Sequence, residues 1–127
     1  MNEILTQEKS IYIQIKEMIE QDILRNILLE EERVPSTNEL AKLYAINPAT
    51  AAKGINLLVD EGTLYKKRGI GMFVAEGAKT RIMEKRKKNF YDDFVKSLMA
   101  EASSLGITRK ELIAMIEESE DGGMENE

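Results

Sequence analysis

The chain has 127 residues, of which 43% are hydrophobic and 32% charged, a composition typical of one small folded domain with an appendage. Cysteine and histidine are both absent, which excludes thiolate and zinc–thiolate chemistry and removes the commonest general base and metal ligand. We therefore expect neither an enzyme nor a cofactor. No apolar run is long enough to span a bilayer and no secretory signal opens the chain, so we expect a cytoplasmic protein without a membrane partner.

The net charge of −5 is unevenly distributed along the chain. Residues 33–74 hold six basic and three acidic residues, and residues 79–88 hold six basic residues and one acidic residue. Residues 117–127 hold six acidic residues and no basic one. The pattern predicts a partly basic body with a disordered acidic tail over residues 121–127.

Two helices are predicted first. Apolar residues at three- and four-residue steps indicate a helix over residues 11–28, with Ser10 as its cap. A second helix should begin at Ser36, because Glu39 lies three residues later and completes a capping box.

A third helix and a hairpin follow. Asn47 is a good cap, and Pro48 suits the first position of a helix that runs to about Glu61 and stops at Gly62. Residues 63–75 alternate in polarity around a glycine-containing turn, which predicts two strands.

The remaining chain returns to helical periodicity. One apolar stripe runs from Ile82 to about Ala102, and a final helix should begin at Thr108 with Glu111 in the capping-box position. The fold class predicted from these elements is mainly α with a small β-hairpin.

Three helices followed by a hairpin have the order of a winged helix-turn-helix domain. In this arrangement the third helix reads the major groove, and the hairpin contacts the DNA backbone or the minor groove. We predict residues 47–61 as the recognition helix and residues 63–75 as the wing. The predicted DNA contacts are short, polar or basic residues: Ser36, Thr37, Asn38, Asn47, Ala49, Thr50, Lys53, Lys67, Arg68, Gly69 and Gly71.

Four segments resemble the GntR family of bacterial transcription regulators: VPSTNELA (34–41), INPATA (46–51), LVDEG (58–62) and RGIGMFV (68–74). The resemblance covers roughly residues 10–76, and the short C-terminal region is similar to that of the YtrA subfamily. It implies a winged helix-turn-helix domain over residues 1–76 and a two-helix dimerisation region over residues 77–120. The implied function is sequence-specific repression by a homodimer on a palindromic operator in double-stranded DNA. The sequence leaves open the operator, any small-molecule effector and whether the protein represses or activates transcription.

The sequence departs from the family at three positions. Asn38, Pro48 and Ala52 stand where the family commonly carries Arg. Asn47, Thr50, Lys53 and the wing must therefore carry more of the DNA binding.

The C-terminal stripe has two interpretations. Its apolar residues either cover the wing domain within one chain or complete a core between two subunits, and we favour the second. The predicted dimerisation residues are Phe90, Phe94, Leu98, Leu112 and Ile116. The basic run Lys85–Lys88 lies either near phosphates or on a solvated helix face. The alternative function is a winged-helix protein-interaction module with little affinity for DNA.

Overall fold

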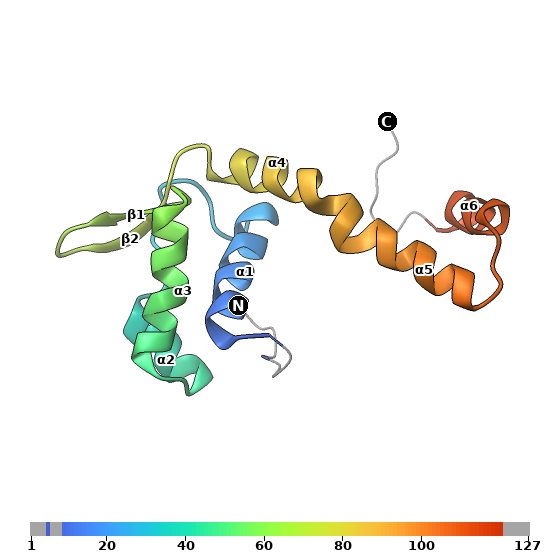
Figure 1. Ribbon diagram of the computed structural model, residues 1–127. Helices are drawn as coiled ribbons and strands as arrows, with labels where there is room; N and C mark the ends of the chain where they lie inside the picture. The colour runs from blue at the N-terminus through green and yellow to red at the C-terminus, as the bar shows by residue number, and fades with distance from the viewer. Residues whose placement is uncertain (1–4, 6–8, 121–127) are drawn as a thin grey trace. The chain divides into compact units, whose positions relative to one another are not determined.

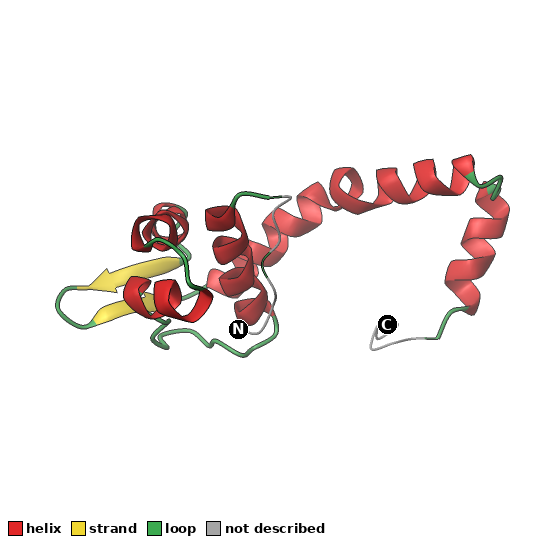
Figure 2. Cartoon of the chain, turned by 90° about the horizontal axis from the view of Figure 1, so that it is seen from below, coloured by secondary structure: helices red, strands yellow, loops and turns green. Residues whose placement is uncertain are grey.

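The computed structural model describes residue 5 and residues 9–120. The elements are α1 (Ile11–Leu24), α2 (Thr37–Tyr44), α3 (Pro48–Asp60), β1 (Leu64–Lys67), β2 (Gly71–Val74), α4 (Ala78–Phe90), the π-helical turn η1 (Tyr91–Val95), α5 (Lys96–Ser104) and α6 (Arg109–Glu118). The predicted fold class is confirmed (Figure 1, Figure 2). The chain divides into two compact units, with the boundary inside α4 between Lys85 and Arg86. The acidic tail predicted over residues 121–127 lies outside the described residues.

Helix α1 begins at Ile11 as predicted but ends earlier than predicted. Ser10 is the N-cap residue and has the extended backbone of a cap, but its side chain makes no capping hydrogen bond. The helix ends at Leu24 instead of residue 28, because Asn26 takes a left-handed conformation (φ 63°). The amides of Ile27 and Leu28 then donate to the carbonyl of Asp22 at 2.8 and 3.1 Å. These bonds satisfy backbone groups at a helix terminus without further helix.

The predicted starts of α2 and α3 are confirmed. The Glu39 amide donates to Ser36 Oγ at 3.0 Å, and the Ser36 amide donates to Glu39 Oε1 at 2.6 Å, which completes the capping box. Asn47 Oδ1 accepts from the Ala49 amide at 2.7 Å, with Pro48 in the first helical turn. Between the two helices Ala45 adopts a left-handed conformation (φ 53°) that turns the chain sharply.

The hairpin is antiparallel, with Leu64 opposite Val74 and Lys67 opposite Gly71. A preceding segment lies along the other edge of β2: the Glu31 amide donates to the Val74 carbonyl at 2.7 Å, and the Val34 amide donates to the Met72 carbonyl at 2.9 Å. Strand β2 therefore has a hydrogen-bonded neighbour on each edge, and the tip of the hairpin lies beyond these contacts. Figure 1 shows the hairpin extending away from α1, α2 and α3.

The core of the first unit brings α1, α2, α3, the hairpin and the start of α4 together. Its largest fully buried side chains are Ile15, Ile19, Ile23, Leu40, Ile55, Leu58, Leu64, Ile82, Val34 and Val74. Helices α1 and α3 approach closely at Gly54, where an added Cβ atom would lie 2.7 Å from the Tyr12 carbonyl oxygen. The missing side chain at Gly54 therefore sets the distance between α3 and α1.

An ionic network joins α4 to the rest of the first unit. Lys85 Nζ lies 2.8 Å from Glu20 Oε2 and 3.4 Å from Glu61 Oε1, while Lys16 Nζ lies 2.9 Å from Glu61 Oε2. The Glu20 side chain is only 3% exposed, and Lys85 supplies a counter-charge to it. The Lys85–Lys88 run was predicted to lie near phosphates or on a solvated helix face. Neither describes Lys85, because its ammonium group pairs with Glu20 and Glu61 of the same unit.

Other basic residues of this region also make internal contacts. Lys79 Nζ donates to Asn26 Oδ1 at 3.0 Å, and the Arg81 guanidinium donates to the carbonyls of Gly62 and Glu76. Together with Lys85, these residues attach the first half of α4 to the winged domain. Part of the basic segment at residues 79–88 therefore makes contacts within the protein that hold α4 in place.

Because of this ionic network, the free energy of unfolding should depend on pH. Burial alone would raise the pKa of Glu61, but the ammonium groups of Lys16 and Lys85 outweigh it and hold that pKa below its usual value. A carboxyl group whose pKa is lower in the folded state stabilises the fold above its unfolded pKa of about 4.3, and this stabilisation disappears as the pH falls through the folded value. We predict that Glu61→Gln lowers the free energy of unfolding at pH 7 and reduces its loss between pH 5 and 3.

Urea unfolding followed by circular dichroism at fixed protein concentration measures this effect. Glu117→Gln, an exposed change in α6, is the matched control and should leave the acid profile unchanged. An acid profile of Glu61→Gln identical to that of the wild type would show that the ion pairs contribute nothing.

The second unit contains η1, α5 and α6. The predicted final helix is confirmed, with the Glu111 amide donating to Thr108 Oγ1 at 3.1 Å and the Thr108 amide donating to Glu111 Oε1 at 2.8 Å. The helix predicted to run to about residue 102 ends at Ser104 with α5, and η1 interrupts its regular α-helical repeat. A π-turn inserts an extra residue, which shifts the angular positions of the residues that follow.

Candidate nucleic-acid interface

The predicted recognition helix presents one exposed side. Its buried residues, Ala51, Gly54, Ile55 and Leu58, lie together against the core. Asn47, Ala49 and Lys53 are exposed as predicted, whereas Thr50 is half-buried at the flank of the helix. Asn56 is also exposed, one turn beyond Lys53, and the sequence interpretation missed it. Three-residue spacing could have found it, because it places Asn56 beside Lys53 on a helix surface.

Lys53 is the basic side chain of this face, and its position is set by a contact with α1. Its Nζ lies 4.1 Å from the centroid of the Tyr12 ring, a cation–π distance. The ring restrains the ammonium group while leaving the lysine exposed. Sequence interpretation missed Tyr12, because nothing in a local pattern places α1 beside residue 53.

The predicted contacts at the start of α2 divide into two kinds. Ser36 uses both its hydroxyl and its amide in the capping box, and these bonds hold the pKa of Glu39 below its usual value. Thr37 is half-buried, whereas Asn38 is exposed. Among these three predicted contacts, Asn38 is therefore the one whose side chain is exposed. Asn47 likewise acts as a cap, because its side-chain Oδ1 accepts a hydrogen bond from the Ala49 amide.

The turn of the wing carries the predicted basic pair. Lys67, Arg68 and Gly69 are exposed, and Lys67 Nζ lies 4.5 Å from the centroid of the Phe73 ring. Gly71 is half-buried and has a different role, because a Cβ atom there would lie 2.9 Å from Arg33 Nε. Gly71 thus makes room for Arg33, which the sequence interpretation did not select.

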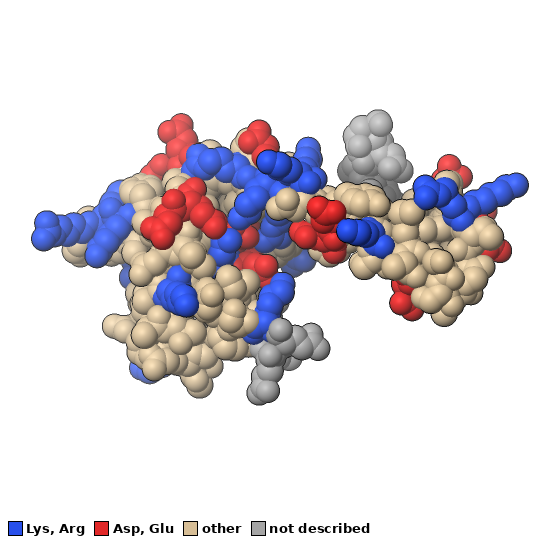
Figure 3. Space-filling model, in the orientation of Figure 1, with Lys and Arg blue, Asp and Glu red and all other residues tan. Residues whose placement is uncertain are grey.

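The wing is rich in positively charged side chains. Figure 3 shows Lys and Arg side chains covering the projecting part of the hairpin. At its base the Tyr65 hydroxyl donates to the Glu31 carboxylate, and this hydrogen bond raises the pKa of Tyr65. The acidic group is therefore paired at the root of the hairpin, while the basic groups lie at its tip. A basic tip suits phosphates, which supply most of the sequence-independent affinity of DNA-binding proteins.

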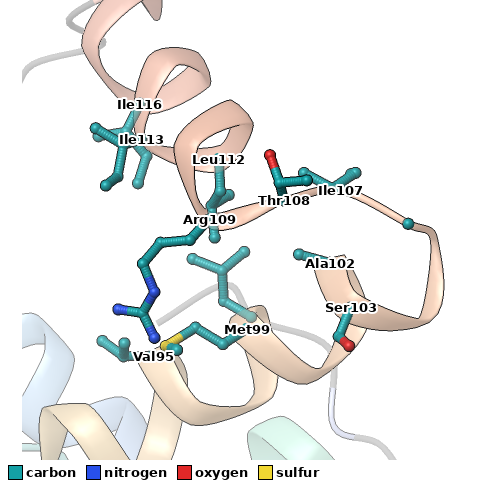
Figure 4. Close-up of a pocket in the computed structure, with 12 residues that line it drawn as sticks. Val95, Met99, Ala102, Ser103, Ile107, Thr108, Arg109, Leu112, Ile113 and Ile116 are labelled. Atoms are coloured by element: carbon teal, nitrogen blue, oxygen red, sulfur yellow. The ribbon is translucent and has the colours of Figure 1, made fainter.

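The second unit holds the predicted dimerisation residues. Phe90, Phe94, Leu98 and Ile116 are exposed, and Leu112 is half-buried. The rings of Phe90 and Phe94 lie 5.3 Å apart. Leu98, Leu112 and Ile116 line an apolar groove of about 630 Å³ between α5 and α6 (Figure 4).

The described residues contain no helix both long and apolar enough to cross a bilayer. Within the same ranges, no group of carboxylates is arranged to hold a metal ion.

Comparison with known proteins assigns the chain to a family. The model of the bacterial regulatory proteins of the gntR family matches residues 11–74. The chain belongs to the GntR family. Members of this family are DNA-binding transcriptional regulators, so the chain is one as well and is not an enzyme.

Individual GntR relatives extend the similarity beyond the winged domain. The transcriptional repressor YtrA of Bacillus subtilis is 32% identical over 108 residues, which cover 85% of this chain and 82% of YtrA. The structure of a GntR regulator from Listeria monocytogenes is 25% identical and matches with a TM-score of 0.71. The match covers 91% of this chain and 100% of that one. AraR(DBD) in complex with operator ORX1 is 33% identical with a TM-score of 0.51, covering 59% of this chain and 92% of that one. The first two matches include the C-terminal region and support the YtrA-like assignment.

Proposed function

We propose that this GntR regulator is a repressor that binds a palindromic operator as a homodimer. In this proposal the exposed side of α3 enters the major groove, and the wing contacts the backbone or the minor groove. A regulator of transcription acts where the chromosome lies, which is the cytoplasm of a bacterium. The observation that carries the proposal is the pairing of an exposed, restrained Lys53 with a projecting basic hairpin in one winged unit.

The homodimer is supported by the second unit. Four of its large apolar side chains are about half exposed or more: Phe90 at 53%, Phe94 at 63%, Leu98 at 46% and Ile116 at 58%. A contiguous apolar surface on a soluble chain marks an interaction site. A second copy of the same chain provides a self-complementary partner, and twofold symmetry matches a palindrome with half-sites about one helical turn apart.

Selection of genomic fragments by the purified protein, followed by fluorescence anisotropy on the selected duplex, tests the proposal. We expect tight binding to the selected sequence, weaker binding to a scrambled duplex, and a steep fall in affinity as salt increases. Equal, weak binding to all duplexes would instead favour the protein-interaction module.

Lys53→Ala should weaken binding to the operator by about 1–3 kcal/mol, the range for loss of a base contact. The wild-type ammonium lies above the Tyr12 ring, so Tyr12→Leu should reproduce part of this loss, whereas Tyr12→Phe should not. Lys110→Ala, an exposed change in α6, is the matched control for charge. Unchanged operator affinity in Lys53→Ala would contradict the proposed docking of α3.

The double variant Lys67→Ala, Arg68→Ala should weaken binding to operator and scrambled duplexes alike. Both residues act through charge on phosphates, so the salt dependence should flatten by about one to two units of slope. The control is the pair Lys96→Ala, Lys110→Ala, which removes the same charge from the second unit. Loss of binding to one sequence only, with the slope intact, would mean that these two residues read bases.

A further inference from the structure

The tip of the wing carries one aliphatic side chain among cations and glycines. The turn is closed by the Ile70 amide, which donates to the Lys67 carbonyl at 2.9 Å, and Gly69 supplies the left-handed conformation it requires (φ 77°). Ile70 is 62% exposed, although turns favour polar residues and glycine. Arg68 and Gly69 precede it and Gly71 follows it, so Ile70 is the bulky apolar group of this tip.

The backbone that carries Ile70 is braced from below. Arg33 Nε donates to the Ile70 carbonyl at 3.5 Å, and the Arg33 side chain lies against Gly71. Arg33 is itself held, since its backbone pairs with Phe73 in an antiparallel bridge and its guanidinium lies 3.7 Å from Glu39. The turn is therefore supported on the side of Arg33, while the side chain of Ile70 projects into solvent. A supported group can contact a ligand without first losing much conformational freedom.

We propose that Ile70 enters the minor groove of the operator and selects base pairs that lack the 2-amino group of guanine. The inference rests on the proposed function, and it assigns the tip of the wing to the minor groove and not to the DNA backbone alone. An aliphatic side chain gains nothing against phosphates, whereas apolar side chains do occupy minor grooves. Lys67 and Arg68 lie beside Ile70 in the chain, where they can meet the phosphates that border the groove.

The chemistry of the groove floor gives the selectivity. An A·T pair presents only the adenine N3 and thymine O2 acceptors there, and a G·C pair adds the guanine N2 donor. Isoleucine has no acceptor for this donor, so contact would strip the amino group of water without replacing its hydrogen bond. A·T-rich segments also have the narrow, electronegative minor groove that attracts Lys and Arg. Both effects favour A·T beneath the wing, but only the first depends on Ile70.

Inosine separates the two grooves. An inosine·cytosine pair keeps the major-groove edge of G·C but lacks the 2-amino group. We would place A·T, G·C or inosine·cytosine at each position flanking the half-site and measure affinity by fluorescence anisotropy. At the positions under the wing, the wild type should bind A·T and inosine·cytosine duplexes similarly and the G·C duplex about 5- to 20-fold more weakly.

Substitution of Ile70 tests the residue itself. Ile70→Ser should reduce the discrimination against G·C to less than about twofold while leaving the salt slope unchanged, because no charge is removed. Ile27→Ser is the matched control, since Ile27 is a 58% exposed isoleucine outside the wing, and it should keep the wild-type discrimination. Arg33→Met removes the brace from the turn and should weaken the discrimination, with circular dichroism confirming that the variant is folded.

Three results would overturn the inference. The wild type could bind all three duplexes equally at every flanking position, inosine·cytosine could behave like G·C, or Ile70→Ser could keep the full discrimination. The last result would assign the preference to groove shape read by the basic residues. Failure of the proposed function is a separate outcome, because the wild type would then bind no duplex with sequence preference.

Discussion

Replacing Phe94 with glutamate should convert the proposed dimer into a monomer whose winged unit remains folded. Phe94 is 63% exposed and packs its ring against Phe90 on the apolar side of the second unit. Burial of one such side chain is worth about 1.5–3 kcal/mol, and a twofold interface contains it twice. The new carboxylate would enter the interface without a partner, which adds a desolvation penalty.

Loss of the dimer should also weaken DNA binding. A dimer that has bound one half-site holds its second winged unit near the other, which raises overall affinity by about 10²- to 10⁴-fold over a single site. We therefore expect Phe94→Glu to bind a full palindrome no more tightly than an isolated half-site. Direct contacts of α3 and the wing should persist, so the weak binding should still respond to Lys53→Ala.

Sedimentation velocity at micromolar concentration, together with anisotropy on full and half operators, measures both effects. Met83→Glu is the matched control, because it makes the same apolar-to-acidic change on α4 in the first unit. That variant should remain dimeric. A monomeric wild type, or a dimeric Phe94→Glu, would rule out an interface at this position.

Local signals predicted most of the secondary structure correctly. The capping boxes at Ser36 and Thr108 and the Asn47–Pro48 start are determined by residues within four positions of one another, so a sequence pattern is sufficient to find them. Ser10 occupies the cap position of α1, but its side chain makes no capping hydrogen bond although its residue type is suitable. A cap is a preference of about 1 kcal/mol, which neighbouring interactions can override.

Contacts between distant segments could not be predicted in this way. Tyr12 lies under Lys53, Arg33 braces the wing, and Lys85 meets Glu20, although these partners are many residues apart in sequence. Each pairing depends on how α1, the wing and α4 pack, which no local period encodes. The π-turn at residues 91–95 was missed for a related reason, since its residues are compatible with an ordinary helix.

Gly54 is the position where a local rule gives the wrong sign. Alanine in the middle of a helix is normally about 0.5–1 kcal/mol more stable than glycine. At Gly54, however, the added Cβ atom would lie 2.7 Å from the Tyr12 carbonyl oxygen and 3.2 Å from the Ile15 side chain. Both neighbours belong to α1, and Ile15 is fully buried, so relief requires the two helices to separate.

Gly54→Ala should therefore lower the free energy of unfolding by about 1–2 kcal/mol, since overpacking of about 1–3 kcal/mol outweighs the gain in helix propensity. Gly54→Val should lower it by about 3 kcal/mol or more, because its branched side chain needs still more room beside α1. Urea unfolding followed by circular dichroism gives both values. Asn56→Ala, an exposed change in the same helix, is the control and should raise stability by a few tenths of a kcal/mol. If Gly54→Ala stabilised the protein as much as Asn56→Ala does, α1 and α3 would not be in close contact at this point, and the restraint of Lys53 by Tyr12 would lose its structural basis.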